Sequence, residues 1–139
     1  MTHRDIARVV PSASNLYHEL QKAYADHVDK AYLGEHNAEW TELGMRRVIA
    51  FRDAGNDHRF FDIHFAPFQK DPLPTLERLY DFLGEELTDE TRGRMAAWRQ
   101  NTPRDKHGSH HDPADFGIDV AALRERFRFY SDRFGVATA

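Results

Sequence analysis

Residues 1–12 read MTHRDIARVVPS, and this stretch decides how the start of the chain folds. It places Arg4 eight residues before Ser12, across a turn that leads into a helix. Proline suits the first turn of a helix, so Pro11 marks an expected start. The large apolar residues that follow recur at every fourth position: Leu16, Leu20 and Tyr24. The pattern predicts a loop and then a helix over about 11–27, an arrangement more typical of the middle of a fold than of its frayed beginning.

The composition predicts one globular domain over residues 1–139. Hydrophobic residues make up 40% of the chain and include ten Phe, which is enough to bury a core. The net charge is −4, with 19 basic and 23 acidic residues mixed along the chain, so we expect no nucleic-acid partner. We also expect no membrane span, because no apolar run approaches the roughly 20 residues required. The absence of cysteine excludes disulfides and thiolate metal ligands, and it fits a cytoplasmic protein.

The remaining pattern predicts a mainly α fold with one or few strands. The segment HRFFDIHFAPF, residues 58–68, alternates in character and is rich in aromatic residues, which predicts a strand. A lone strand cannot satisfy its own backbone donors and acceptors. It must therefore pair with strands that the sequence does not obviously provide.

Four more helices are expected after the first. Trp40, Leu43 and Phe51 lie near one face of a helix over about 35–53, with Gly55 as its stop. The others run over about 73–84 with Gly84 at the exit, from an N-cap at Thr88 to before Pro103, and from an N-cap at Asp119 to about 134.

Two places in the sequence are suited to binding an anion. Arg4 offers a planar guanidinium, and Ser12, together with free backbone N–H groups at a helix start, supplies further donors. The long polar segment NTPRDKHGSHHDPADFG, residues 101–117, adds Arg104, Lys106 and the flexible Gly108. Taken singly, each has a plain structural alternative, a helix cap for Ser12 and a solvated loop for the second segment.

The histidines suggest two other chemistries. His107, His110 and His111 with Asp112 offer imidazole and carboxylate ligands for a transition metal, but adjacent histidines are hard to place together, and we expect no metal site. His64 on the strand has the right chemistry for an acid or base, although a packed sheet histidine is the simpler interpretation. No catalytic residue can be assigned.

These motifs, taken together and in this order along the chain, point to one protein family more specifically than any of them does singly. Arg4 and Ser12, an aromatic strand, KDPLPTLERLYDFLGEELTDE (70–90) and PRDKHG (103–108) together resemble the C-terminal half of bacterial-type sulfotransferases that use 3′-phosphoadenosine-5′-phosphosulfate. The resemblance implies part of an α/β, P-loop-like fold with a parallel sheet. It also implies that Arg4, Ser12, Lys106 and Gly108, helped by Arg104, hold the 3′-phosphate of the nucleotide. Ala66 and Pro67 replace an acidic pair that the family has near the strand end.

The resemblance implies transfer of a sulfuryl group to a hydroxyl or amine of a small-molecule, lipid or carbohydrate acceptor, leaving adenosine 3′,5′-bisphosphate. In the family the phosphosulfate-binding loop and the catalytic base precede the Arg and Ser element, so we expect them before Met1. The isolated chain is then expected to hold nucleotide but to do little chemistry, and its partner is either a missing N-terminal half or a second copy. The alternative is a non-catalytic helical interaction module derived from the same fold.

Overall fold

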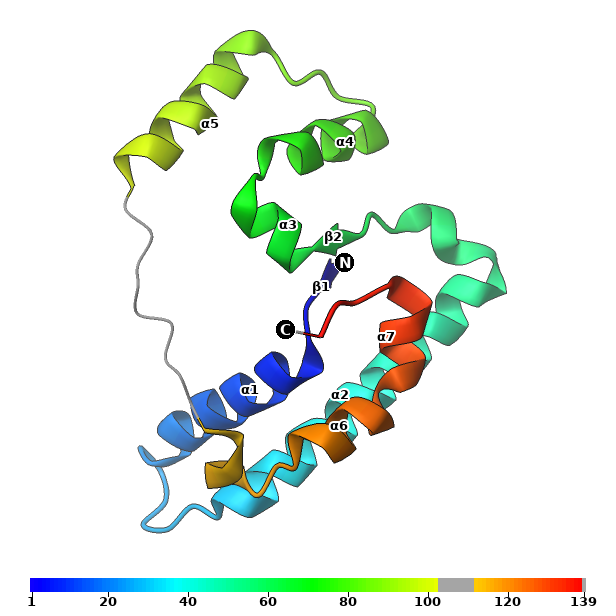
Figure 1. Ribbon diagram of the computed structural model, residues 1–139. Coiled ribbons are helices and arrows are strands. Elements are labelled where there is room, and N and C mark those ends of the chain that lie inside the picture. The colour runs from blue at the N-terminus through cyan, green and yellow to red at the C-terminus, as the bar shows by residue number, and fades with distance from the viewer. Residues whose placement is uncertain (103–111, 139) are drawn as a thin grey trace. The chain divides into compact units, whose positions relative to one another are not determined.

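The computed structural model describes residues 1–102 and 112–138 (Figure 1). They form two compact units, a sheet unit of residues 1–2 and 61–102 and a helical unit of residues 3–60 and 112–138. The strand β1 (Thr2–His3) contributes one residue to each, and the sheet unit adds β2 (Ile63–His64), α3 (Phe65–Lys70), α4 (Leu73–Leu83) and α5 (Asp89–Asn101). The helical unit contains α1 (Ile6–Gln21), α2 (Lys30–Phe51), η1 (Arg52–Asn56), η2 (Asp57–Arg59), η3 (Pro113–Phe116), α6 (Val120–Arg126) and α7 (Arg128–Phe134). The fold class is as predicted, mainly helical with two short parallel strands.

The first helix starts earlier than predicted. Asp5 is its N-cap, and the Asp5 carboxylate accepts a hydrogen bond from the backbone N–H of Ala7 at 3.1 Å. Pro11 therefore lies inside α1 rather than in its first turn. The prediction of a start at 11 was wrong because Asp5 provides a stronger local signal for the helix start than the proline does.

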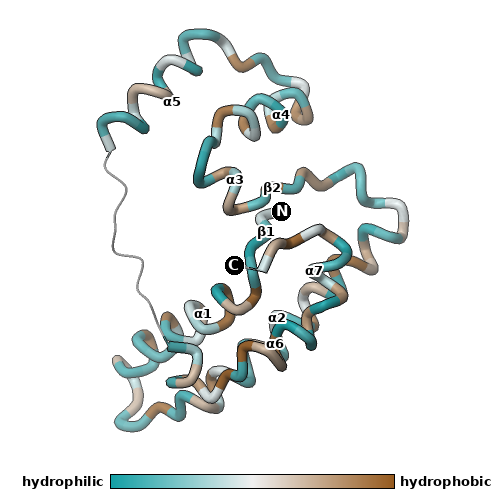
Figure 2. Tube along the Cα trace, in the orientation of Figure 1, coloured by the Kyte–Doolittle hydropathy of each residue, from teal (hydrophilic) through white to brown (hydrophobic). Residues whose placement is uncertain are grey.

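The buried faces of α1 and α2 are not the ones that the large apolar residues suggested. Leu16 and Leu20 are 58% and 54% exposed, and Trp40 is 62% exposed. The buried residues lie at other positions instead: Ile6, Ala7, Val10, Pro11 and Ser14 on α1, and Leu33, Gly34, Asn37 and Ala38 on α2. Figure 2 shows hydrophilic and hydrophobic positions mixed along both helices. Within the described ranges, no helix is both long and apolar enough to cross a membrane.

The core of the helical unit joins α1 and α2 to the C-terminal helices. Val10 and Phe127 are fully buried, and Leu33 and Phe116 are nearly so. A polar link runs through this core, because Asn37 Nδ2 donates to the Leu33 carbonyl at 2.8 Å and to Ser14 Oγ at 3.3 Å. Such satisfied buried groups fix the pairing of two helices more specifically than apolar contact alone.

The predicted strand over 58–68 is much shorter in the structure. Only Ile63 and His64 form β2, and α3 begins at Phe65. The missing partner is the chain's own start: Ile63 N donates to the Met1 carbonyl at 2.8 Å, and the amino group of Met1 donates to the Phe61 carbonyl. The sequence does not make this partner obvious, because a strand of two residues leaves no periodic pattern.

Several predicted helix ends are confirmed. Gly84 ends α4 in the left-handed conformation, with φ of 70°. Thr88 caps α5 by accepting from Thr91 N at 3.2 Å, and Asp119 caps α6 through Ala121 N at 2.8 Å. The last predicted helix is in fact two, since Phe127 at φ −99° and ψ 13° separates α6 from α7.

Candidate functional site

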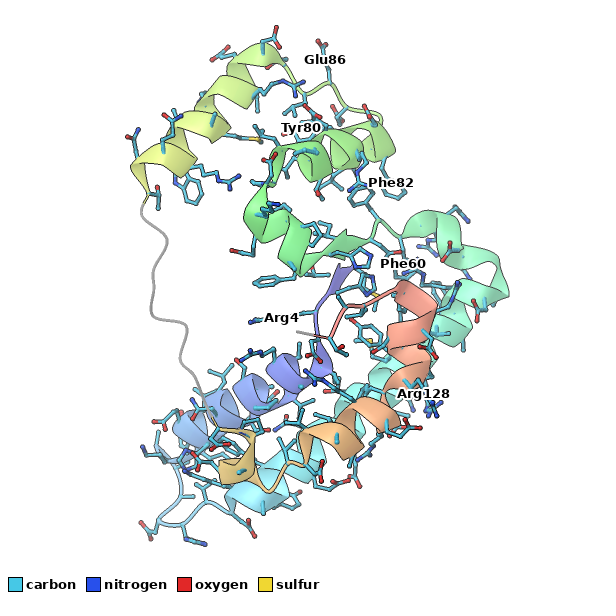
Figure 3. All side chains as sticks on the ribbon, in the orientation of Figure 1. Arg4, Phe60, Tyr80, Phe82, Glu86 and Arg128 are labelled. Carbon is cyan, nitrogen blue, oxygen red and sulfur yellow. The ribbon has the colours of Figure 1, made fainter. Side chains whose placement is uncertain are left out.

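Arg4 lies in the short passage between β1 and α1. It is exposed, whereas its two neighbours are buried, His3 at 1% and Asp5 at 5% exposed. Figure 3 shows the Arg4 side chain extending away from the backbone of this passage. The sequence thus presents one cation between two anchored residues.

The imidazole of His3 is held by the last helix. His3 Nδ1 is 3.2 Å from the hydroxyl oxygen of Tyr130, and its ring stacks on that of Phe134 at a centroid distance of 4.4 Å. Phe134 also packs against the guanidinium of Arg52, which lies 4.9 Å from the ring centroid. His3 is therefore part of a packed aromatic column rather than an exposed acid or base.

The carboxylate of Asp5 both caps the start of α1 and forms an ion pair with Arg124. Besides capping Ala7 N, it accepts from Arg124 Nη2 at 2.5 Å and from Arg124 Nε at 3.4 Å. Hydrogen bonding to Asp5 raises the pKa of Arg124 above its ordinary value. The negative charge of Asp5 is thus matched locally and does not oppose an anion near Arg4.

The backbone donors at the start of α1 are mostly used within the protein. Ala7 N donates to the Asp5 carboxylate, and Arg8 N and Val9 N donate to the Asp5 carbonyl at 2.9 and 3.3 Å. The expectation of several free N–H groups beside Ser12 was therefore wrong, because Ser12 lies beyond the first turn of α1. An anion here would depend on side chains.

Arg8 offers a second exposed cation near the start of α1. Arg8 is exposed, it makes no ion pair with the described part of the chain, and it lies four residues before exposed Ser12 on α1. Residues four apart share a helix face, so a cation and a hydroxyl adjoin there. We did not identify Arg8 from the sequence, because the late predicted helix start placed it in a loop; recognising Asp5 as the cap would have found it.

The other predicted site residues lie outside the described residues. These are Arg104, Lys106 and Gly108, together with His107, His110 and His111 of the metal hypothesis. Asp112 is described, and its carboxylate caps η3 by accepting from Ala114 N at 3.0 Å. Among the residues that are placed, no group of three His, Asp or Glu side chains could hold a metal ion. His64 lies half-buried in β2, and Ala66 and Pro67 fall in α3.

The sheet unit carries a groove of about 1290 Å³ beside α5. Its apolar wall includes Phe68, Leu76, Met95 and Trp98. Trp98 is 69% exposed, so a large aromatic surface stands open there. Pockets with this lining generally take the apolar parts of ligands or of other proteins.

Comparisons with known proteins agree on one family. The sequence profile of the sulfotransferase family matches residues 1–89. The structure is similar to sulfotransferase STF9 from Mycobacterium avium, with a TM-score of 0.85 and 27% identity over 97% of this chain. It also has the fold of sulfotransferase STF1 from Mycobacterium tuberculosis H37Rv, with a TM-score of 0.71 and 24% identity over 90% of the chain.

The likeness covers only part of each larger protein. This chain spans 35% of the STF9 chain and 31% of the STF1 chain. No curated protein sequence matches it. Since the family profile covers more than half of its residues, and includes the Arg4 passage, α1, α2 and α4, the chain belongs to the sulfotransferase family.

Proposed function

We propose that this chain supplies the 3′-phosphate-binding part of a sulfotransferase that uses 3′-phosphoadenosine-5′-phosphosulfate. Arg4 and Ser12 are the ligands that the family resemblance implies, and Arg8 is added on its exposure and position. In the complete reaction a sulfuryl group passes to a hydroxyl or amine of a small-molecule, lipid or carbohydrate acceptor in the cytoplasm, and adenosine 3′,5′-bisphosphate is released.

The observation that supports this proposal most is the placement of Arg4. Because the residues on both sides of Arg4 are buried and anchored, its backbone loses little conformational freedom when the guanidinium binds, so more of the interaction energy is available to the ligand. Its planar donors match two oxygens of a phosphate, and the Ser12 hydroxyl can donate to an oxygen as well. The carboxylate next to Arg4 in sequence, that of Asp5, forms an ion pair with Arg124. This donor set fits a phosphate dianion.

The nucleotide supplies the sulfuryl group when it is bound, and the described residues of this chain contribute binding and orientation. Arg4 and Arg8 bring positive charge to the 3′-phosphate, which fixes one end of the nucleotide. Positioning of this kind makes a large contribution to group-transfer catalysis. We assign no general base within residues 1–102 and 112–138, so proton removal from the acceptor is not attributed to them.

The loop residues remain part of the proposal. Lys106 and Gly108, with Arg104 beside them, are the second segment that the resemblance places on the same phosphate. A lysine and a glycine in a basic segment suit that task, because a glycine backbone can approach an oxygen closely.

The test is a calorimetric titration of the chain with adenosine 3′,5′-bisphosphate and with adenosine 5′-monophosphate. Only the first carries the 3′-phosphate, and we expect it to bind more tightly. Arg4→Ala should weaken its binding by about ten- to a hundredfold, the usual loss for a hydrogen bond to a charged group. Binding of the monophosphate should change little.

Arg128→Ala is the matched control, since Arg128 is an exposed arginine of α7 that pairs with Glu125. It should bind both nucleotides as the unmodified chain does. Equal affinity of the unmodified chain for the two nucleotides would contradict the proposal.

A second function is favoured by a separate observation, the open groove beside α5. Its exposed Trp98 and apolar wall suit a non-catalytic helical module that binds another polypeptide. This function predicts no preference for the 3′-phosphate in the titration above, so the same experiment separates the two.

A further inference from the structure

Both residues that flank Arg4 are held by the C-terminal helices. Asp5 pairs with Arg124 of α6, which is 119 residues later in sequence, and His3 contacts Tyr130 of α7, which is 127 residues later. Two contacts of such separation on either side of one exposed residue bring distant segments to a single point. The passage between β1 and α1 is thus shaped by the end of the described chain.

On the Asp5 side, the contact is a charge-assisted ion pair between the Asp5 carboxylate and the Arg124 guanidinium. The side chain of Asp5 is 3% exposed and that of Arg124 is 34% exposed, and two guanidinium nitrogens face the carboxylate. A charge-assisted pair with a buried carboxylate resists rearrangement, because breaking it leaves that charge unpaired. Asp5 also caps α1, so the pair ties the helix start to α6.

The contact on the His3 side is an aromatic stack supported by another cation. His3 lies on Phe134 at 4.4 Å and beside Tyr130 at 5.7 Å between ring centroids. Arg52 is almost fully buried over the Phe134 ring and donates to Asp57 Oδ1 at 2.7 Å. This packing holds the His3 ring in place. It thereby also restrains the backbone that leads into Arg4.

From these contacts we infer that Arg124 and Tyr130 are positioning residues: they clamp Asp5 and His3 and so hold Arg4 in the orientation that binds a 3′-phosphate. The inference rests on the proposed function for its consequence in binding, but the clamp itself is a property of the fold. Neither residue has to touch the nucleotide. Loosening the clamp would restore freedom to the backbone at Arg4, which binding must then remove again.

The test uses Arg124→Lys, which keeps the charge but loses the planar fork. The expected result is a roughly three- to tenfold weaker affinity for adenosine 3′,5′-bisphosphate, because the backbone at Arg4 must then be ordered on binding, with no change for adenosine 5′-monophosphate. The heteronuclear NOE of the Arg4 amide, measured without nucleotide, should fall in the same variant.

Arg126→Lys is the matched control. Arg126 is on the same helix and forms comparable ion pairs, with Glu42 and Glu35, but none of these involves Asp5. It should lower thermal stability without changing the ratio of the two nucleotide affinities or the Arg4 NOE. A general loss of structure would move both variants alike.

If Arg124→Lys fails to fold, the same two affinities and the Arg4 NOE are measured on Tyr130→Phe instead. This change removes only the hydroxyl that contacts His3 and keeps the ring. If the unmodified chain prefers adenosine 3′,5′-bisphosphate, an unchanged affinity ratio in the folded variant overturns the inference, whatever the NOE shows. If the unmodified chain does not distinguish the two nucleotides while the NOE still falls, the proposed function fails and the clamp stands.

Discussion

Glu42 shows how single ion pairs join α2 to α6. Its carboxylate accepts from Arg126 Nε at 2.6 Å and from Arg46 Nε at 2.8 Å. These hydrogen bonds, that from Arg126 most of all, lower the pKa of Glu42 below its ordinary value. Hydrogen bonding to Glu42 and Glu35 raises the pKa of Arg126 in turn.

The hydrogen bonds from Arg126 and Arg46 to Glu42 make the stability of the folded protein sensitive to acid. The pKa of Glu42 is lower in the folded protein than in the unfolded chain, where it takes the ordinary value of a glutamate. The stabilisation is therefore present above that value and is lost as the pH falls through the lower folded-state pKa. We expect Glu42→Gln to reduce the free energy of unfolding at pH 7 by about 1–2 kcal/mol and to make thermal stability less dependent on pH between roughly pH 5 and pH 3.

The comparison is Glu39→Gln, a change to an exposed carboxylate on the same helix. Its melting temperature should follow that of the unmodified chain across the same range. If Glu42→Gln and the unmodified chain lose stability in parallel as the pH falls, Glu42 is not responsible for the acid sensitivity.

At the scale of elements, Gly34 sets the distance between α2 and η3. A Cβ atom placed on Gly34 would lie 2.1 Å from the carbonyl oxygen of Phe116 and 3.1 Å from Ile118 Cγ1. The obstruction is backbone, so it cannot be relieved by a side-chain rotation. The close approach buries Phe116 against α1 and α2.

We expect Gly34→Ala to lower the free energy of unfolding by about 1–3 kcal/mol, the usual cost of overpacking, despite the better helix propensity of alanine. Gly44→Ala on the same helix meets no atom within 4 Å and should instead stabilise by about 0.5–1 kcal/mol. Urea denaturation measures both. A stabilised Gly34→Ala variant would show that η3 is not packed on α2 as described.

The elements that the sequence predicts well are those with local signals. Thr88, Asp119 and Gly84 end their helices through contacts with residues a few positions away, which a sequence pattern contains. Strand pairing and helix faces depend on distant partners. Met1 pairs with Ile63, and α1 buries Ile6 and Val10 while Leu16 and Leu20 stay exposed. Neither the strand pairing nor the buried face could be predicted from spacing alone.

The candidate site divides in the same way. Arg4 and Ser12 are recognisable from their spacing and from the family resemblance, although their role in binding stays a proposal. The residues that hold Arg4 in place, Arg124 and Tyr130, could not be predicted, because only the folded chain brings them next to Asp5 and His3.

At the scale of the whole molecule, the notable feature is the apolar surface that each unit leaves exposed. Trp40 in the helical unit and Trp98 in the sheet unit are both more than 60% exposed. Exposed apolar residues of this kind commonly contact another polypeptide or a ligand.

The likeness to STF9 involves 35% of that protein's length. The predictions of a phosphosulfate-binding loop on a further segment, and of a single domain over 1–139, are not tested by these observations and stay predictions.

The central claim is that the passage from β1 into α1 binds a 3′-phosphate. The most direct test is a titration of the isotopically labelled chain with adenosine 3′,5′-bisphosphate, followed through its amide resonances, because this detects even weak binding and assigns it to residues. We predict that the resonances of Arg4, Arg8 and Ser12 shift with this nucleotide and stay in place with adenosine 5′-monophosphate. Shifts that are absent from these residues, or that are the same for both nucleotides, would contradict the account.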